Sequence, residues 1–277
     1  MKNVIDTLDS VQLKKLQLIE LDTLKEIDRI CRKYDINYSL TGGTLLGAIR
    51  HKGFIPWDDD VDIALKRKDF IRLQRVCQKE LKSEFFFQCH DSDKGWYRLY
   101  SKIRVNGTQF KELAHCQHDI HHGVYIDIFA LDNVPNNKIL RHLQYIYFQF
   151  FNIGLSVKYI NSSYRKRNKR IIAILLKVLY FPFSLDFLYK TADRISKRYN
   201  NCSCIFLTNF NGAYGKKEVF PQKYFLETID MPFEDTYLKC SKYFDDILSQ
   251  LYGDYMQLPS PDKRVSLHKI IEMDLDY

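Results

Sequence analysis

Apolar residues recur at helical intervals near the start of the chain and at strand intervals further on. Across residues 10–34 they form one broad stripe, which predicts an amphipathic helix: Val11, Leu13, Leu16, Leu18, Ile19, Leu21, Leu24, Ile27 and Ile30. The stretch "INYSLTGG" (36–43) predicts a short strand that ends at a glycine pair. The stretch "TLLGAIRHKG" (44–53) then predicts a short helix with Gly53 as its C-cap.

The middle of the chain alternates predicted strands and helices. After the turn "GFIPWDDD" (53–60), the stretch "DVDIAL" (60–65) predicts a buried strand and residues 66–81 predict a helix. Three more strands are predicted over "SEFFFQCH" (83–90), "WYRLYSKIRV" (96–105) and "GVYIDIFALDNV" (123–134). This order predicts an α+β fold, in which residues 1–133 form a mixed β-sheet core flanked by helices.

The second half of the chain has a more helical pattern. Residues 136–200 are predicted to be mostly helical, a turn-rich segment follows around "NFNGAYGKKEVF" (209–220), and "TYLKCSKYFDDILSQLY" (236–252) predicts a last helix. We therefore assign residues 134–277 to a largely helical C-terminal lobe. This lobe is expected to complete the functional site and to face an acceptor or a membrane.

Composition and charge narrow the class of protein. The 277 residues are 45% hydrophobic, which suffices for a large core, and the net charge of +8 suits an anionic partner. Nucleic acid is not expected, because no recognised binding motif is present and acidic residues cluster where phosphates would lie. The seven cysteines lack zinc spacing, and no secretory signal is evident at the N-terminus. We expect reduced thiols and a cytoplasmic protein.

Two apolar stretches, residues 145–157 and 171–183, are each shorter than the roughly 18–20 residues that span a bilayer. A basic segment, "YRKRNKR" (164–170), lies between them. Such a pattern suits peripheral contact of residues 145–183 with the inner face of the plasma membrane. A buried helical hairpin with a solvated basic connection is the alternative.

The aspartates of "WDDDVDIAL" (57–65) indicate a metal site. Asp60 and Asp62 are two residues apart, so on a strand they share a face, where their charges repel unless a cation joins them. Mg²⁺ or Mn²⁺ suits such oxygen ligands. An exposed acidic turn is the alternative; an EF-hand is excluded because Ile63 replaces the required glycine. Asp59 is expected to face away from the pair, and Asp58 to remain in the turn before it.

The glycines add a second element to this site. Gly42 and Gly43 precede a predicted helix, where unobstructed backbone N–H groups can bind a phosphate. A Walker A motif is excluded because Ala48 and Ile49 occupy the positions of its Lys and Ser/Thr. A helix N-terminus followed by a same-face acidic pair is best explained by a metal-bridged diphosphate.

Such a site usually needs a third carboxylate from another strand. Asp127 is the one charged residue inside the apolar run "VYIDIF" (124–129), whereas Asp132 lies at the end of that run among turn residues. The alternative for Asp127 is an ion pair with a buried arginine. Basic residues that could contact phosphates are Lys102 and Arg104, which share a strand face, and Arg50, which follows the glycine helix.

Three stretches together resemble the LicD family of phosphotransferases, within the nucleotidyltransferase superfamily. They are "GGTLLGAIRHKGFIPWDDDVDIAL" (42–65), "GVYIDIFALD" (123–132) and "LYGDYMQLP" (251–259), the last followed by Arg264 and His268. The resemblance implies a nucleotidyltransferase-like fold. It also implies transfer of a phospho-alcohol from a CDP-activated donor to a sugar hydroxyl of a cell-surface glycan.

The resemblance also implies roles for particular residues. Asp60, Asp62 and Asp127 are implied to be the catalytic, metal-binding acids. The implied substrate-binding residues are Gly42, Gly43 and Thr44 at the start of the helix, with Arg264 and His268 in the third motif. Bacterial members use CDP-choline, and animal relatives use CDP-ribitol.

The carried alcohol stays open between choline and ribitol, glycerol or ethanolamine. A quaternary ammonium is bound by aromatic faces, and the candidate cage residues are Trp57, Trp96, Tyr97 and Tyr100. The acceptor is expected to be a lipid-linked precursor of teichoic acid or lipopolysaccharide. Nucleotidyl transfer to a small molecule and a non-enzymatic membrane scaffold are the alternative functions.

Overall fold

The structure is a computed structural model that describes residues 4–5, 7–161, 167–266 and 268–276. Its centre is a mixed sheet of seven strands. Five strands follow one another in the order β1 (Ser39–Leu40), β2 (Asp62–Lys66), β6 (Tyr125–Val134), β4 (Ser101–Val105) and β3 (Phe85–Gln88). Only β2 and β6 pair in parallel, while the other strand pairs of this sheet are antiparallel. The predicted mixed sheet is confirmed.

Two helices pack on the sheet and build the main core. In α1 (Ser10–Lys33) most of the apolar stripe is buried from Leu16 onward, whereas Val11 and Leu18 are exposed. Asp9 caps the first turn by accepting from the backbone N–H groups of Val11 and Gln12. In α3 (Arg67–Glu80) the buried residues are Phe70, Leu73 and Cys77. These residues join Ile63, Ile126 and Ile128 of the strands in one apolar cluster, so α1, α3 and the sheet are held together by burial of apolar surface.

The glycine segment forms the start of α2 (Gly42–His51), directly after β1. The helix begins two residues earlier than predicted. It ends at Lys52, which adopts the left-handed conformation (φ +58°), so Lys52 and not Gly53 is the C-cap. Strand β4 is also shorter than predicted, since it begins at Ser101 and residues 96–100 before it are not part of a strand.

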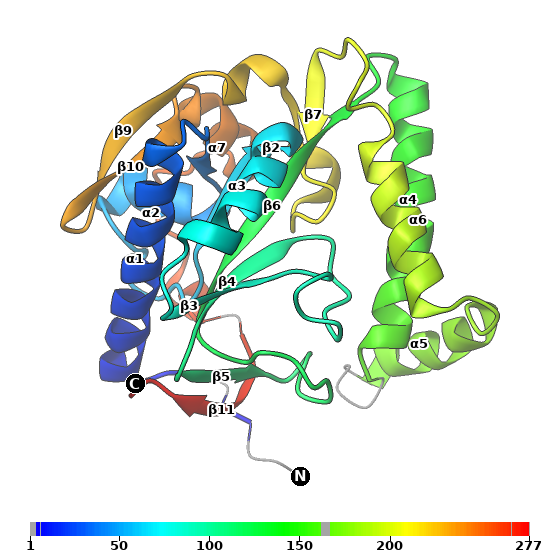
Figure 1. The fold of residues 1–277 in the computed structure, drawn as a ribbon, viewed down its shortest axis with the longest axis horizontal. Coiled ribbons are helices and arrows are strands. Elements are labelled where there is room, and N and C mark those ends of the chain that lie inside the picture. The colour runs from blue at the N-terminus through cyan, green and yellow to red at the C-terminus, as the bar shows by residue number, and fades with distance from the viewer. Residues whose placement is uncertain (1–3, 6, 162–166, 267, 277) are drawn as a thin grey trace.

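A layer of three helices lies to the right of the sheet in Figure 1. It consists of α4 (Lys138–Tyr159), α5 (Arg167–Leu179) and α6 (Leu185–Lys197). Phe148, Phe151 and Leu155 of α4 pack against Leu188 and Ala192 of α6 in a second apolar cluster. The predicted helical region over residues 136–200 is confirmed for its described residues, and residues 164–166 of the predicted basic connection lie outside them.

The chain beyond residue 200 contains more strands than the sequence predicted. β7 (Phe206–Thr208) and β8 (Val219–Pro221) extend the central sheet, β9 (Thr228–Phe233) and β10 (Thr236–Ser241) form a hairpin, and β11 (Ile270–Asp274) pairs with β5 (Gln109–Glu112). The predicted helix over 236–252 is wrong for its first half, because α7 begins only at Phe244 and ends at Tyr252. Leu238 and Cys240 are buried at alternate positions of β10, which is the period of a strand.

Three short 3₁₀ turns complete the described secondary structure: Gly215–Glu218, Gln222–Phe225 and Pro261–Lys263. Within the described residues, no helix combines the length and the apolar character needed to cross a membrane.

Candidate active site

Asp62 and Asp127 occupy equivalent positions on the two parallel strands at the centre of the sheet. Asp62 is the first residue of β2, and its partner across the ladder is Asp127 of β6. Because paired residues of neighbouring strands point to the same face, both carboxylates lie on one side of the sheet. Asp60 precedes the strand and lines the same cavity of about 200 Å³. The structure thus brings together the three acidic residues that the sequence singled out.

Burial and mutual repulsion disfavour ionisation of these acids. The pKa of Asp62 is raised well above its ordinary value by burial first, and then by the charges of Asp60, Asp127 and Asp58. Burial also raises the pKa of Asp127, against the opposing effect of Lys102. A bound cation would remove this repulsion, and carboxylate oxygens are the ligands that Mg²⁺ and Mn²⁺ prefer. The donor set therefore fits such an ion.

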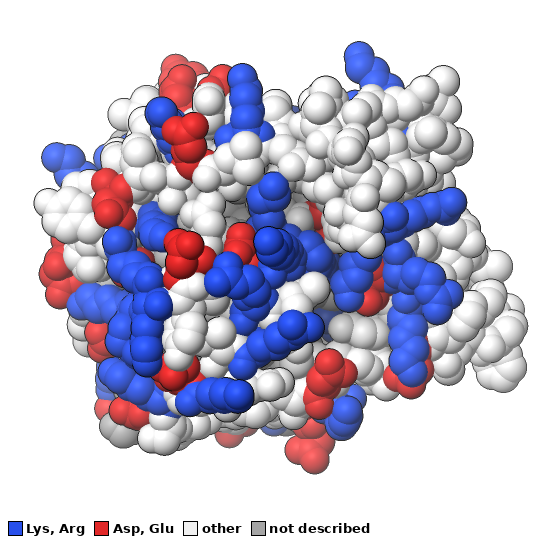
Figure 2. All heavy atoms as spheres, turned by 45° about the horizontal axis from the view of Figure 1, so that its top comes forward, with Lys and Arg blue, Asp and Glu red and all other residues white. Residues whose placement is uncertain are grey.

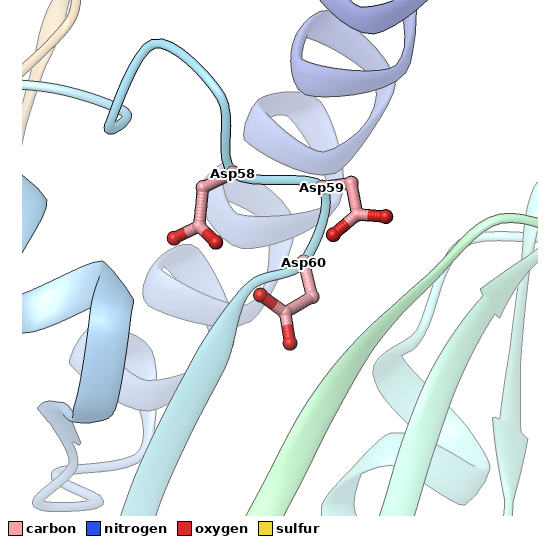
Figure 3. Close-up of side chains that lie close together, drawn as sticks. All are labelled: Asp58, Asp59 and Asp60. Carbon is pink, nitrogen blue, oxygen red and sulfur yellow. The ribbon is translucent and has the colours of Figure 1, made fainter. Parts of the chain in front are cut away.

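Three neighbouring aspartates form a tight group at the turn before β2 (Figure 3). One carboxylate oxygen each of Asp58, Asp59 and Asp60 lies within 4.8 Å of the others. We expected Asp58 to stay apart from the metal site, but its half-buried carboxylate lies beside that of Asp60. Loss of contact with water, followed by the charges of Asp60 and Asp59, raises the pKa of Asp58 well above its ordinary value. Asp58 is therefore an additional candidate for holding a cation together with Asp60.

Asp59 instead forms hydrogen bonds with residues of the C-terminal segment. Its carboxylate accepts hydrogen bonds from the Ser266 hydroxyl and the His268 backbone N–H, and it lies 3.1 Å from Nδ1 of His268. Burial alone would lower the pKa of His268, but the hydrogen bond with Asp59 and the charges of Asp60 and Glu112 raise it to about 10. A charged His268 thus ties the end of the chain to the acidic turn.

The glycine pair leaves room for two of these carboxylates. Gly42 has a φ of +56°, and a Cβ atom added there would lie 3.0 Å from Oδ2 of Asp62. A Cβ atom at Gly43 would lie 2.7 Å from Oδ2 of Asp58. A side chain at either position would therefore crowd the acids, which is a second reason for glycine beside the free approach to backbone N–H groups.

The start of α2 is also bonded to the acidic strand. The backbone N–H of Asp62 donates to the Thr44 hydroxyl at 2.8 Å, so Thr44, which is buried, fixes the first residue of β2. Thr41 at the N-cap makes no capping hydrogen bond through its side chain. Thr41 and Gly42 line the cavity with the acids, and the N-terminus of α2 with its dipole is thereby directed toward it.

A buried lysine accompanies Asp127. Lys102 on β4 is the partner of Asp127 across the antiparallel ladder, and its Nζ lies 3.1 Å from Oδ1 of Asp127 and 3.4 Å from Oε2 of Glu112. Burial lowers the pKa of Lys102, while the two carboxylates oppose this change. The ion pair expected as an alternative for Asp127 is present, with lysine in place of arginine. It coexists with the cavity that Asp127 lines.

Arg104 shares the strand face with Lys102, as predicted, but it serves the core. Its guanidinium donates to Oε1 of Gln88 at 2.8 Å and to the Gly123 carbonyl at 2.7 Å. The guanidinium also lies over the ring of Tyr125. Arg104 is completely buried and does not line the acidic cavity. Its hydrogen bonds hold it in the protein core and not at the cavity surface, where a phosphate could reach it.

Three other predicted substrate-binding residues gather around residues 255–264. Arg50 donates to the Tyr255 carbonyl at 2.8 Å, and Arg264 donates to the Pro259 carbonyl and lies over the ring of Trp57. None of these residues lines the acidic cavity. The third motif of the sequence therefore packs on the segment that follows the glycine helix.

Of the four candidate cage residues, Tyr100 alone lines the cavity. Trp96 is fully buried and donates its indole N–H to the Tyr100 carbonyl, while Tyr97 bonds Asp186 and contacts His90. Phe129 on β6 lines the cavity beside Tyr100 and contacts its ring. The cavity therefore has an aromatic wall, which is formed by Tyr100 and Phe129 and not by the four predicted residues together.

The opposite wall of the cavity was missed from the sequence. It is formed by residues of the segment before β8: Asn209, Asn211, Gly212, Ala213, Tyr214 and Glu218, with Leu251 of α7. The Glu218 carboxylate accepts the backbone N–H of Tyr214 at 2.8 Å, and burial raises the pKa of Glu218 to about 7. In the sequence this wall has only the Asn- and Gly-rich composition of a turn.

Glu20 is a further acid that the sequence did not single out. It lies on the buried side of α1, and burial followed by the charges of Asp60, Asp59 and Asp58 raises its pKa well above the ordinary value. Its Oε2 atom has no hydrogen-bond partner among the described residues. No sequence pattern indicated a role for Glu20, because glutamate is common in a helix such as the one predicted for residues 10–34.

Comparison with known proteins agrees with this arrangement. Residues 35–153, which include the glycine pair and all the acids of the cavity except Glu218, match the LicD/FKTN/FKRP nucleotidyltransferase domain. The chain is also 32% identical to the lipopolysaccharide cholinephosphotransferase LicD of Haemophilus influenzae, over 94% of this chain and 97% of that protein. The chain belongs to the LicD family of phosphotransferases.

Two proteins from Rickettsia species match shorter parts of this chain. An uncharacterized protein of Rickettsia prowazekii is 44% identical over 63 residues, which are 23% of each chain. An uncharacterized protein of Rickettsia typhi is 38% identical over 76 residues, which are 25% of each chain. The family that the motifs indicated is confirmed by the match over nearly the full chain.

Proposed function

We propose that this protein transfers phosphocholine from CDP-choline to a sugar hydroxyl of a lipopolysaccharide-type glycan precursor and releases CMP. The Haemophilus influenzae relative, a lipopolysaccharide cholinephosphotransferase, supports the choice of group and acceptor class. Precursors of teichoic acid are the alternative acceptors. A cytoplasmic location, where CDP-choline would be available, is part of the proposal.

The pairing of Asp62 with Asp127 beside the start of α2 carries the proposal. It combines a cavity with three converging acids and a helix N-terminus at the same wall, an arrangement that we interpret as nucleotidyltransferase-like. Mg²⁺ or Mn²⁺ held by these acids would neutralise charge on the diphosphate and favour departure of CMP. In this proposal the backbone N–H groups at the start of α2 bind the diphosphate oxygens, and Gly42 allows them a close approach.

The chemical step is a displacement at the phosphorus that bears choline. The acceptor hydroxyl oxygen forms a new bond to this phosphorus as its bond to the bridging oxygen breaks, and the bridging oxygen leaves with CMP. The hydroxyl proton passes to Asp127, or to solvent if Asp127 serves only as a ligand. Lys102 balances the charge of Asp127 at 3.1 Å and keeps its carboxylate in place for either role.

The walls of the cavity supply a means to recognise the alcohol. Tyr100 and Phe129 offer aromatic faces on the sheet side, and Tyr214 and Glu218 stand on the other side. A trimethylammonium group would gain cation–π attraction of about 0.5–2 kcal/mol per ring and charge attraction from an ionised Glu218. Ribitol and glycerol would gain neither, and this difference favours choline over these alcohols in our proposal.

The test is CMP release by the purified protein with Mg²⁺, a glycan acceptor and one CDP-alcohol at a time. We expect CDP-choline to give the fastest release and mass spectrometry to find phosphocholine on the acceptor. Faster release from CDP-ribitol, CDP-glycerol or CDP-ethanolamine would change the carried alcohol and keep the reaction. A nucleotide adduct on the acceptor, with release of pyrophosphate from a nucleoside triphosphate, would overturn the proposal in favour of nucleotidyl transfer.

A further inference from the structure

The positive charge of the chain is concentrated in one segment. Residues 133–185 contain nine Lys and Arg and no Asp or Glu, a balance of 9 − 0 = +9. The remaining residues carry 42 − 9 = 33 Lys and Arg against 34 Asp and Glu, a balance of −1. The whole net charge of +8 thus arises from the segment that contains α4 and α5.

The same segment exposes many large apolar side chains. One face of α4 packs against α6, and the exposed face carries a stripe at helical spacing: Ile139, Leu140, Leu143, Ile146, Tyr147, Phe150 and Ile153. In Figure 2 the right-hand side of the molecule, where Figure 1 places α4, is largely free of acidic side chains. A polar face is what a solvent-exposed helix would show here, so this stripe needs another explanation.

The α5 helix is more apolar still. Ala173 is buried, while Ile171, Ile172, Ile174, Leu175, Val178 and Leu179 are all exposed. Val178 is 75% exposed, and Phe181, directly after the helix, is 82% exposed. The expected alternative of a buried helical hairpin is therefore wrong for α5. We call these exposed residues of α4, α5 and Phe181 the α4–α5 face.

The two parts of this face are joined. Tyr180 is buried, its hydroxyl donates to the Phe150 carbonyl at 2.7 Å, and its ring contacts the ring of Phe150. A Cβ atom at Gly154 would lie 2.5 Å from the Tyr180 ring, so this glycine allows the close approach of α5 to α4. The exposed residues Phe150 and Phe181 therefore belong to one connected surface.

We propose that the α4–α5 face docks on an anionic lipid bilayer, with its apolar side chains in the headgroup region. Contiguous exposed apolar surface of this kind marks a site of interaction. Basic residues such as Arg170 and Lys177, both exposed, complement anionic headgroups, whereas two copies of a segment with a charge of +9 would repel each other. Amphipathic helices with this pairing of basic and apolar residues lie in the interface without crossing it.

This inference stands apart from the proposed reaction, since it uses no residue of the acidic cavity. Its consequence is positional, because a docked protein would meet lipid-linked acceptors at the membrane surface. The test is co-sedimentation of the full chain with phosphatidylcholine vesicles, with and without phosphatidylglycerol, at low and high salt. We expect binding to vesicles that contain phosphatidylglycerol, weakened by salt.

The variant L175E/V178E replaces two exposed apolar residues of α5 and should weaken vesicle binding by at least roughly tenfold. The matched control is V11E, at a 77% exposed position of α1. K177E should weaken binding, whereas K94E, also at an exposed position, should not. Circular dichroism would verify that all variants keep the fold, and CMP release with a soluble acceptor should be unchanged in L175E/V178E.

Three results would overturn the proposal. The first is equal vesicle binding by the natural protein and L175E/V178E. The second is equal binding to vesicles with and without phosphatidylglycerol, which would remove the role of the basic segment. The third is a dimer in solution that L175E/V178E dissociates, without vesicle binding, which would assign the α4–α5 face to a second copy of the chain.

Discussion

Asp62 and Asp127 face each other across the only parallel strand pair of the described sheet. They come from positions 65 residues apart, yet the register of β2 and β6 makes them direct partners. Lys102 is the partner of Asp127 on the other side, so an acid, an acid and a base lie in a row across three adjacent strands. This row places a repulsive pair beside a compensating charge, and its parts can be tested separately.

Replacing Asp62 by Asn should stabilise the metal-free protein and abolish phosphocholine transfer. The substitution removes a buried like charge next to Asp60 and Asp127, while the amide keeps the shape of the side chain. Thermal unfolding with and without Mg²⁺ checks this. We expect a higher melting temperature than the natural protein without metal and a smaller increase when Mg²⁺ is added.

The control for this experiment is Asp22→Asn, at an exposed position of α1 whose carboxylate lies 3.8 Å from Lys25. It should leave both the melting temperature and the response to Mg²⁺ nearly unchanged. An Asp62→Asn protein with an undiminished response to Mg²⁺ and near-normal CMP release would show that the cation binds elsewhere.

Replacing Gly42 by Ala tests whether the glycine exists to admit the Asp62 carboxylate. The new Cβ would be strained at a φ of +56° and would lie 3.0 Å from Oδ2 of Asp62. We expect a destabilisation of about 1–2 kcal/mol from the backbone strain, together with a loss of CMP release that exceeds the effect on folding. Urea unfolding and initial rates measure the two effects.

Gly253→Ala separates strain from crowding. Gly253 also has a positive φ, +73°, but an added Cβ would have nothing within 4 Å. Because the ψ of Gly253 is −124°, outside the left-handed helical region, this variant should lose at least as much stability as Gly42→Ala, and it should retain activity. If both variants lost activity equally, crowding of Asp62 would not be the reason for the glycine at position 42.

Much of this site could be predicted from the sequence, because its acids interrupt apolar strands. A lone carboxylate in a buried run, such as Asp127, is costly unless it has a function, and Asp62 could be recognised by the same reasoning. Asp58 was set aside because its place in a turn gave no sign that the chain would fold its carboxylate back beside Asp60. The contact depends on the path of the turn, which no local pattern specifies.

The wall from Asn209 to Glu218 could not be predicted for a different reason. Asn and Gly are common in any turn, so their composition does not distinguish a cavity wall from an ordinary loop. Strand β9 follows the segment that was predicted to be turn-rich, and β10 was missed because its residues were assigned to one helix with those of α7. Their strand character arises from pairing with each other and from contact of Ser241 with Ser39 of β1.

Replacing Lys102 by Met should strongly destabilise the protein. Lys102 is buried between Asp127 and Glu112, and its loss leaves Asp127 without its ion-pair partner, while Glu112 keeps only Arg104 at 4.0 Å. Breaking a buried ion pair in this way costs about 3–5 kcal/mol. Lys111→Met is the matched control, because Lys111 pairs with Glu272 at 3.9 Å near the surface and should cost less than about 1 kcal/mol. Similar urea midpoints for the two variants would contradict the structural role of Lys102.

The contact between His268 and Asp59 predicts non-additive substitutions. If His268 acts by holding the acidic turn through Asp59, then Asp59→Asn, His268→Gln and the double variant should lose CMP release to a similar extent. Residues that act independently would instead show losses that multiply. Multiplied losses would indicate that His268 contacts the substrate directly, as the family resemblance implied. Asp22→Asn combined with Asp59→Asn provides the additive reference.

Glu218 predicts a pH dependence of stability that an amide should remove. Burial raises the pKa of Glu218 to about 7, above the ordinary value of 4.5, so between these values the folded protein holds a proton that the unfolded chain releases. The stabilisation is complete below pH 4.5 and is lost as the pH rises through about 7, an effect of roughly 3 kcal/mol. Glu218→Gln stays neutral and should have a flatter profile between pH 5 and 8.

Urea unfolding of the natural protein and Glu218→Gln at a series of pH values measures this difference directly. Glu84→Gln, at an exposed position, should leave the profile unchanged. The sign is the informative part, because Glu218→Gln should gain stability relative to the natural protein as the pH rises. A gap between the two proteins that stays constant from pH 5 to 8 would mean that Glu218 is already ionised in the folded state. The cavity wall opposite Asp62 would then be anionic at neutral pH even without a bound cation.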